Sequence, residues 1–144
     1  MIKQLSLSVI ILVLFSSFAF AYPPLVYNRK DITKGDLNKF KVIMQQIPED
    51  YFNGIQAITI RNKPYPLNEN LSGYFEFHSY KTYIWIYKIN ETQEDLLCHI
   101  LLHELGHYKQ FKKLILRYSI NEISKKGLSE RYAEDFAINN SYLC

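Results

Sequence analysis

The β-strand patterns of this sequence are confined to residues 55–89, and helical patterns lie before and after them. Residues 55–60 alternate isoleucines with other residues, which favours a strand. Two aromatic and β-branched runs, 74–77 and 82–89, flank the short segment 78–81 and predict a hairpin. We therefore expect about three strands in a small antiparallel or mixed sheet.

A helix is expected on each side of this strand region. From Thr33, apolar residues recur every three or four positions until Pro48 ends the pattern. Near the C-terminus, Ser129 is placed to cap a last helix that continues to about Asn140. Strands followed by helices favour the α+β class, with the first helix backing the sheet.

A longer helix is expected between the strands and the last helix. Thr92 and Asp95 have the spacing of a capping box, in which the two residues satisfy each other's backbone amides. The helical pattern continues from about Gln93 to Tyr108 or beyond. This helix carries the sequence HELGH at residues 103–107.

Residues 1–21 have the pattern of a cleaved export signal. Lys3 precedes an apolar run at 5–20, and small residues surround the expected cleavage point after Ala21. The alternative is an uncleaved membrane anchor, but the run is shorter than the roughly 20 residues that span a bilayer comfortably. We expect residues 22–144 to form one domain outside the cytoplasm, either secreted, periplasmic or on the cell surface.

The charge of the expected mature chain argues against nucleic acid as a partner. Residues 22–144 contain 16 lysines and arginines against 14 acidic residues. This balance lacks the strong positive charge that nucleic-acid binding requires. After signal cleavage we also expect no membrane partner, because no other segment is apolar enough to cross a bilayer.

Cys98 and Cys144 are the only cysteines of the chain. Outside the cytoplasm an isolated pair is more often bridged than free, and a bridge would tie the chain end to the helix with the HELGH motif. The alternative is one buried thiol and one dispensable thiol in the tail.

The HELGH motif places two imidazoles and a carboxylate together. His103 and His107 are four residues apart, so on a helix they project from one face and can converge on one cation. Zinc accepts neutral imidazole, and Glu104 lies beside the same face, where it can accept a proton without binding the metal. These residues make half of a hydrolytic metal site, and a third ligand must come from another element.

The last helix offers that ligand. Glu130 and Glu134 are one turn apart on one side of it, and Ala133 and Ala137 are one turn apart on another. Small side chains at this spacing let one helix approach another closely, as a ligand helix packed against the motif helix would require.

HELGH followed after 22 residues by Glu130, in an E-x-x-A-x-x-x-A setting, resembles the gluzincin metallopeptidases, and the chain length and order of elements look closest to the small minigluzincins. The resemblance implies that His103, His107 and Glu130 bind one zinc ion per chain. It also implies that Glu104 is the general base and acid of peptide-bond hydrolysis.

Glu134 departs from the family pattern, because many gluzincins carry a shorter aspartate or asparagine at this position to orient a zinc histidine. Glu134 therefore has three readings: it orients a histidine, it replaces Glu130 as the ligand, or it is solvated. We favour Glu130 as the ligand.

The resemblance also implies an extended peptide or protein substrate that pairs with an edge strand. The candidate strand is the first of the hairpin, which comprises Gly73, Tyr74, Phe75, Glu76 and Phe77. Family members commonly add a residue that steadies the oxyanion, for which the candidates here are Tyr132, Tyr142 and His78.

Two other features near the motif have simpler readings. His99, one turn before His103, is expected to be a packing or surface residue. Gly106 is expected to allow close approach of a strand or substrate, and the alternative is a chance occurrence of glycine in the helix. A basic flank follows the motif and is interpreted as a solvated face rather than a contact for an acidic surface. It comprises Lys109, Lys112, Lys113, Arg117, Lys125 and Lys126.

The sequence thus favours an exported zinc endopeptidase. A zinc amidase that acts on a non-protein amide such as peptidoglycan is one alternative. A non-catalytic module stabilised by zinc is the other, although the presence of Glu104 argues against it.

Overall fold

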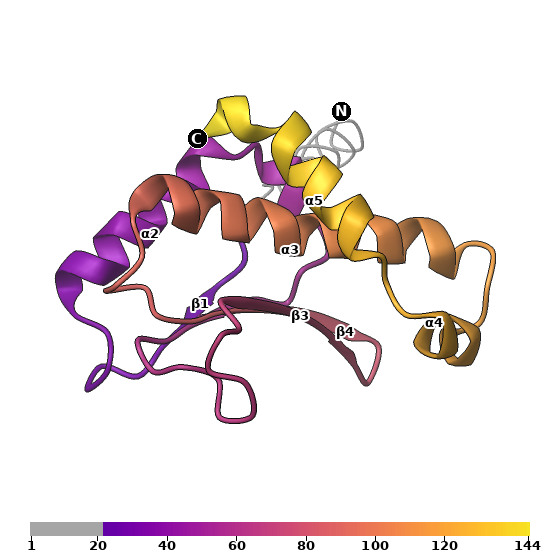
Figure 1. The fold of residues 1–144 in the computed structure, drawn as a ribbon, viewed down its shortest axis with the longest axis horizontal. Coiled ribbons are helices and arrows are strands. Elements are labelled where there is room, and N and C mark those ends of the chain that lie inside the picture. Colours follow the sequence, from indigo (N-terminus) through magenta and orange to yellow (C-terminus); the bar gives the residue numbers. More distant parts are fainter. Residues whose placement is uncertain (1–21) are drawn as a thin grey trace, which may run out of the picture.

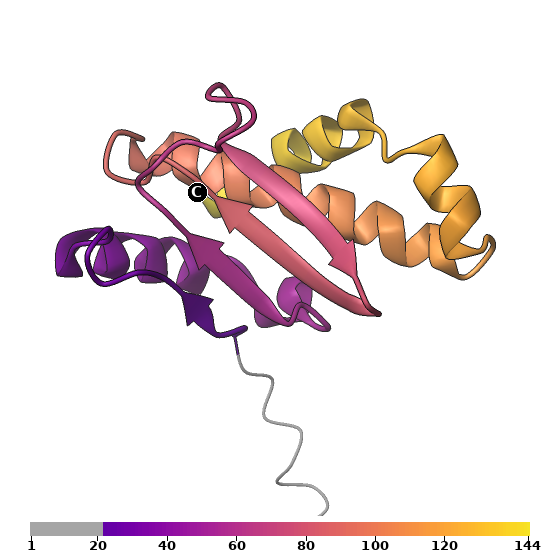
Figure 2. The same cartoon turned by 90° about the horizontal axis from the view of Figure 1, so that it is seen from below.

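The computed structural model describes residues 22–144 (Figures 1 and 2), so the export signal expected at 1–21 lies outside the described residues. The α+β class is confirmed. In chain order the elements are β1 (Leu25–Val26), α2 (Lys34–Gln46), the 3₁₀ helix η1 (Glu49–Phe52), β2 (Ala57–Ile60), β3 (Gly73–His78), β4 (Lys81–Ile86), α3 (Glu94–Ile115), α4 (Ile120–Lys126), α5 (Glu130–Asn139) and the 3₁₀ helix η2 (Ser141–Leu143).

The sheet has four strands in the order β1-β2-β4-β3. β2 pairs parallel with both β1 and β4, whereas β3 pairs antiparallel with β4 and forms one edge. The expectation of about three strands omitted β1, because a strand of two residues is too short to show an alternating pattern. The expected hairpin consists of β3 and β4, joined by Ser79 and Tyr80, both with positive φ as a tight two-residue turn requires.

The helices α2 and α3 lie on one face of the sheet, and α5 crosses over α3 on its far side (Figure 1). Ile58, Ile60, Ile84 and Ile86 of the central strands are completely buried, and so are the leucines of α3 that belong to the same core. These leucines are Leu97, Leu101, Leu102 and Leu105. The core therefore fixes the rotation of α3 about its axis, and with it the direction of the motif side chains.

The start of α3 differs from the sequence prediction. The helix begins at Glu94, with Gln93 as its N-cap and no side-chain capping bond. The Thr92 hydroxyl instead donates to the carbonyl of Lys88 at 2.7 Å, so it belongs to the preceding turn. The predicted capping box with Asp95 was wrong because a local turn competes for the same hydroxyl.

The helix α5 begins at a side-chain cap and is held close to α3 by packing and by a disulfide. Ser129 caps α5 by accepting from the amide of Tyr132, as predicted, and Ala133 and Ala137 are fully buried where the helices meet. Cys144, just after α5, forms a disulfide with Cys98 of α3. None of the helices among residues 22–144 is long and apolar enough to cross a membrane.

Gly106 explains the close approach of the two helices. A Cβ atom at this position would lie 2.8 Å from the Ala133 Cα and 3.0 Å from its carbonyl oxygen. The sequence prediction of close approach was right, but the approaching element is α5, not a strand or a substrate. Glycine here removes the side chain that would keep α5 away from the motif.

Candidate metal site

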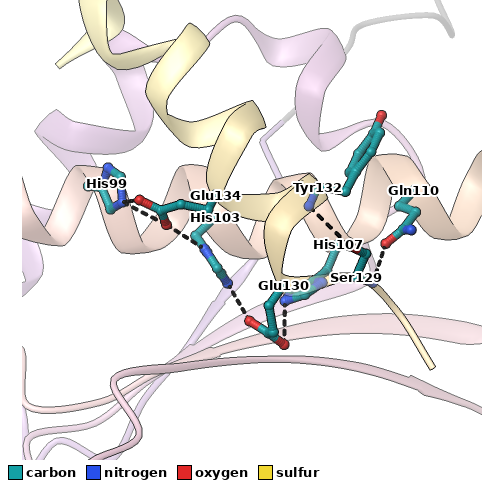
Figure 3. Close-up of polar contacts among 8 residues, drawn as sticks. All are labelled: His99, His103, His107, Gln110, Ser129, Glu130, Tyr132 and Glu134. Carbon is teal, nitrogen blue, oxygen red and sulfur yellow. Dashed lines mark hydrogen bonds and ion pairs between the residues drawn. The ribbon is translucent and has the colours of Figure 1, made fainter.

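Three side chains from α3 and α5 converge on one point. The potential ligand atoms of His103, His107 and Glu130 all lie within 4.8 Å of one another. The Glu130 carboxylate lies 3.1 Å from Nε2 of His103 and 3.4 Å from Nε2 of His107, as Figure 3 shows. We call these three residues the convergent group. They could hold a metal ion, because two imidazole nitrogens and a carboxylate oxygen point toward the same space.

The position of Glu130 follows from the start of α5. It is the first residue of the helix, directly after the cap Ser129. The backbone amide of Ser129 donates to the Gln110 side chain of α3 at 2.8 Å, so the first turn of α5 is attached to the turn that follows His107. Two helices separated by 14 residues of loop and α4 therefore bring their ligand atoms together through a capped and anchored helix end.

Glu134, one turn later, contacts the other ring nitrogen of His103. Its carboxylate lies 3.2 Å from His103 Nδ1 and 3.2 Å from Nε2 of His99 (Figure 3). Burial alone would raise the pKa of Glu134, but hydrogen bonds with His103 and His99 outweigh it and lower this pKa. Glu134 thus holds the His103 ring with Nε2 directed at Glu130, and His99 lies outside the convergent group.

His107 is the buried member of the group. Burial and the nearby His103 lower its pKa, although Glu130 acts in the opposite direction, so the neutral ring is favoured. Among the described residues its Nδ1 atom is buried without a hydrogen-bond partner. A neutral imidazole has a free lone pair, which is the state that binds metal ions.

Glu104 is nearly inaccessible to solvent, with 5% of its surface exposed. Burial, followed by repulsion from Glu130, raises its pKa to about 8, against the opposing effect of a hydrogen bond with the Phe75 backbone. On its other side Glu104 meets Gly73, where an added Cβ would lie 2.5 Å from Oε1. A carboxyl group that titrates near neutral pH therefore lies between the convergent group and the edge strand β3.

A cleft of about 480 Å³ opens over these groups. It is bordered by the loop Asn70–Ser72, the first residues of β3, the motif face of α3, Leu128 and Glu130. The loop and Leu128 were not identified from the sequence, because nothing in their local pattern indicates which distant residues they face.

The predicted substrate strand is only partly on the cleft. Gly73, Tyr74 and Phe75 line it. Glu76 instead accepts a hydrogen bond from the Trp85 side chain at 2.9 Å, and Phe77 packs against Phe111 with ring centroids 4.5 Å apart. The β3 edge therefore borders the candidate site at its N-terminal half.

The three oxyanion candidates do not line the cleft. The Tyr132 hydroxyl accepts a hydrogen bond from Lys113 at 2.8 Å, Tyr142 is 77% exposed beyond α5, and His78 ends β3 at a different hollow near the hairpin turn. Each of these candidates was chosen by residue type alone, and residue type does not specify where a side chain points in the fold.

Comparison with protein-family models, curated proteins and solved structures finds no match to this chain. Any functional conclusion therefore depends on the convergent His103, His107 and Glu130 group, which could hold a metal ion, and on the buried Glu104 beside it.

Proposed function

We propose that this protein is an exported, zinc-dependent metallopeptidase that cleaves peptide bonds within an extended substrate. One observation carries the proposal: a buried carboxyl group, Glu104, lies beside three side chains whose ligand atoms fall within 4.8 Å of one another. The order of these residues also resembles that of the gluzincins.

The donor set suits zinc. Two histidine nitrogens and one glutamate oxygen are a ligand combination of catalytic zinc sites, in which three protein ligands leave a coordination position free. When bound, the ion would supply Lewis acidity, which polarises a carbonyl group and lowers the pKa of water. His103 and His107 would each bind through Nε2, and Glu130 through its carboxylate.

Glu104 would move the proton. Hydrolysis of an amide requires a base that takes a proton from the attacking water and an acid that gives one to the departing nitrogen. With its pKa at about 8, Glu104 exchanges a proton readily near neutral pH, and a bound cation would lower this value by favouring the carboxylate. One side chain can therefore perform both transfers in sequence.

Glu134 would act as a positioning residue. Its contact with His103 Nδ1 fixes the tautomer that leaves Nε2 free for a metal ion. The contact with His99 keeps the Glu134 carboxylate in place. This arrangement supports Glu130, rather than Glu134, as the third ligand.

An extended peptide is the substrate that the edge of the sheet suits best. β3 pairs with β4 on one side, and its N-terminal half borders the cleft. Unpaired backbone groups of an edge strand can pair with an extended chain, which would lay a peptide bond across Glu104 and the ligands. A non-protein amide such as a peptidoglycan bond is a second candidate, because the same groups would act on any reachable amide.

A purely structural metal site is a weaker explanation. Burying an ionisable carboxyl group costs stability, and a structural site has no need of one. The disulfide supports a location outside the cytoplasm, where such bonds persist. The chain would be released after cleavage of the signal at residues 1–21, or held by that segment as an anchor.

The test combines metal content with hydrolysis of casein and a quenched peptide. We expect one zinc per chain, loss of activity in both Glu104→Gln and Glu130→Ala, and loss of metal only in Glu130→Ala. Glu91→Gln, an exposed substitution, is the control and should behave as wild type.

Two results would contradict the proposal. A chain that binds no zinc would exclude it entirely. Stoichiometric zinc without peptide cleavage would exclude a peptidase, and hydrolysis of a peptidoglycan amide by the same preparation would then identify the alternative substrate.

A further inference from the structure

The C-terminal end of α3, the loop that follows and α4 project at one end of the molecule, beyond the sheet (Figures 1 and 2). We call residues 109–128 the α3–α4 end. It exposes large apolar side chains, with Leu116 at 85% and Ile115 at 41% exposed, and the ring of Tyr118 beside them. Removing such exposed apolar surface from water is favourable, so its position at a projecting end suggests a binding partner.

The net positive charge of the molecule is concentrated in the same segment. Residues 109–128 contain six lysines and arginines and one glutamate, a net charge of +5. The rest of residues 22–144 contains ten basic and thirteen acidic residues, a net charge of −3. The near-neutral total therefore conceals a strong division of charge between this end and the remainder.

These cations are not neutralised within the fold. Among residues 22–144, no lysine or arginine of the α3–α4 end lies within 4.0 Å of a carboxylate oxygen. The single acid, Glu122, is occupied by the capping box of α4, where it accepts from the Ser119 amide and hydroxyl at 2.8 Å each. Lys109 is half-buried and donates to the Asp50 carbonyl, but the other five cations are exposed, so most of this charge is open to solvent or to an acidic partner.

Some of the cations are also fixed in place by aromatic rings. Lys126 lies 4.0 Å from the centroid of the Tyr118 ring, and Lys113 donates to the Tyr132 hydroxyl at 2.8 Å. Such contacts hold an ammonium group next to an apolar surface without cancelling its charge. Cations and exposed apolar side chains thus occur together in the α3–α4 end.

We propose that the α3–α4 end docks on an anionic lipid bilayer. Charge complementarity attracts the cations to the headgroups, and the exposed apolar side chains enter the boundary with the acyl chains. A soluble polyanion would satisfy the charges only, whereas a lipid surface satisfies both features. This proposal departs from the sequence-based expectation of a solvated basic flank with no membrane partner, and the experiment below decides between them.

Docking would place the candidate site close to the bilayer. Leu116, the C-cap of α3, follows His107 by nine residues, which corresponds to about 13 Å along a helix. No residue with a proposed role in binding metal or moving a proton belongs to the α3–α4 end. The proposal can therefore be tested without activity, and it stands or falls separately from the peptidase assignment.

The test is co-sedimentation with vesicles of equal parts phosphatidylglycerol and phosphatidylcholine, and with vesicles of phosphatidylcholine alone. The full chain is produced in an exporting host and used as that host processes it, with its amino-terminus determined by mass spectrometry. We expect stronger binding to the anionic vesicles, and at least about tenfold weaker binding in about 0.5 M NaCl, because salt screens the attraction.

Two matched pairs of variants locate the contact. The triple change Lys112→Gln, Arg117→Gln and Lys125→Gln should weaken binding by at least about tenfold. Lys30→Gln, Lys34→Gln and Lys41→Gln remove the same charge from exposed positions elsewhere and should have little effect. Leu116→Ser should weaken binding about fivefold, whereas Leu67→Ser, at an equally exposed leucine (86%), should not.

Each contrary result would overturn the proposal. Equal binding to both kinds of vesicle would show that charge is not the cause. Equal effects of the two triple variants would mean that the total charge, and not this end, determines binding. Retention on a polyanionic heparin matrix without vesicle binding would assign the surface to an acidic polymer instead.

Discussion

Gly106, within the motif helix, faces α5, whereas Gly73 of β3 packs against Glu104 of the same helix, and the two contacts show two ways of building one site. An added Cβ on Gly106 would meet the backbone of α5 at Ala133, which cannot give way without moving the helix. On Gly73 it would meet mainly the side chain of Glu104. The α5 side therefore fixes the three side chains that could hold a metal ion through backbone contact, whereas the β3 side sets the position of one movable carboxyl group, Glu104.

The two sides also differ in how they are secured. The α5 side adds the Cys98–Cys144 disulfide and the anchored cap at Ser129 to the helix contact. At the β3 side the strand is held by pairing with β4 alone in the sheet, since it forms an edge. The side chains proposed to bind metal would thus be held rigidly. Glu104, which is proposed to move protons, would keep some freedom to adjust its position.

The largest expected effect comes from removing the disulfide. Because the bond joins residues 46 positions apart, Cys98→Ala with Cys144→Ala should lower the free energy of unfolding by about 4 kcal/mol on the chain-entropy model. Urea unfolding measures this, and dithiothreitol should destabilise wild type but leave the double variant unchanged. A loss below about 1 kcal/mol would show that the α5 side is secured by packing alone.

Gly106→Ala should have the next largest effect. Its Cβ would lie 2.8 Å from the Ala133 Cα, so α5 must move, at a cost of about 3 kcal/mol in the free energy of unfolding and with weaker zinc binding. Gly35→Ala in α2 is the control, because its Cβ would be 3.6 Å from the nearest atom, and helix propensity should then stabilise the protein by up to about 1 kcal/mol. Similar behaviour of both variants would remove the basis of the comparison.

Contacts between residues close in the sequence were predictable, whereas contacts between distant elements were not predictable from local patterns. His103 and His107, and Ala133 and Ala137, were identified correctly as pairs because helical periodicity places residues four apart on one face. The convergence of the histidines with Glu130 required the family resemblance as well, because no local pattern specifies which helices meet.

The errors came from contacts that a local pattern does not contain. The element facing Gly106 was misjudged because a glycine indicates close approach but not its partner. The role of Gly73 beside Glu104 was not foreseen, because the two residues are 31 positions apart and belong to different elements. Thr92 was misread for a different reason, since two local hydrogen bonds competed for one hydroxyl.

The free energy of unfolding of the metal-free protein should depend on pH through Glu104, the carboxyl group beside β3. The pKa of Glu104 is about 8 in the folded chain, above its ordinary value of 4.5, so the folded state binds more protons between these values and stability falls as pH rises through them. From about pH 6 to about pH 8 the loss attributable to Glu104 should be about 2 kcal/mol.

Urea unfolding with a chelator, at several pH values, measures this effect. Glu104→Gln cannot titrate, so it should lose this part of the slope, and Glu91→Gln should keep it. The histidines titrate in all three proteins, and therefore only the difference between slopes is diagnostic. Equal slopes in wild type and Glu104→Gln would mean that Glu104 is already ionised in the fold, and that the β3 side does not hold it protonated.

The smallest effect on stability should come from Gly73→Ala, with a larger effect on catalysis. Two of the three atoms nearest to the added Cβ belong to Glu104, at 2.5 and 2.9 Å, so this side chain must turn aside. We expect a loss of about 1 kcal/mol in the free energy of unfolding, unchanged zinc content and at least about tenfold slower peptide hydrolysis.

A double-mutant cycle shows whether Glu104 is the cause of the Gly73→Ala effect. In a Glu104→Ala background the added methyl group has room, apart from its contact with Ile100, so Gly73→Ala should then cost much less stability than in wild type. Equal costs in both backgrounds would place the strain at the Ile100 contact or within β3, and not at Glu104. Loss of zinc in Gly73→Ala would mean that the strand also supports the ligands, and the division between a rigid α5 side and an adjustable β3 side would no longer hold.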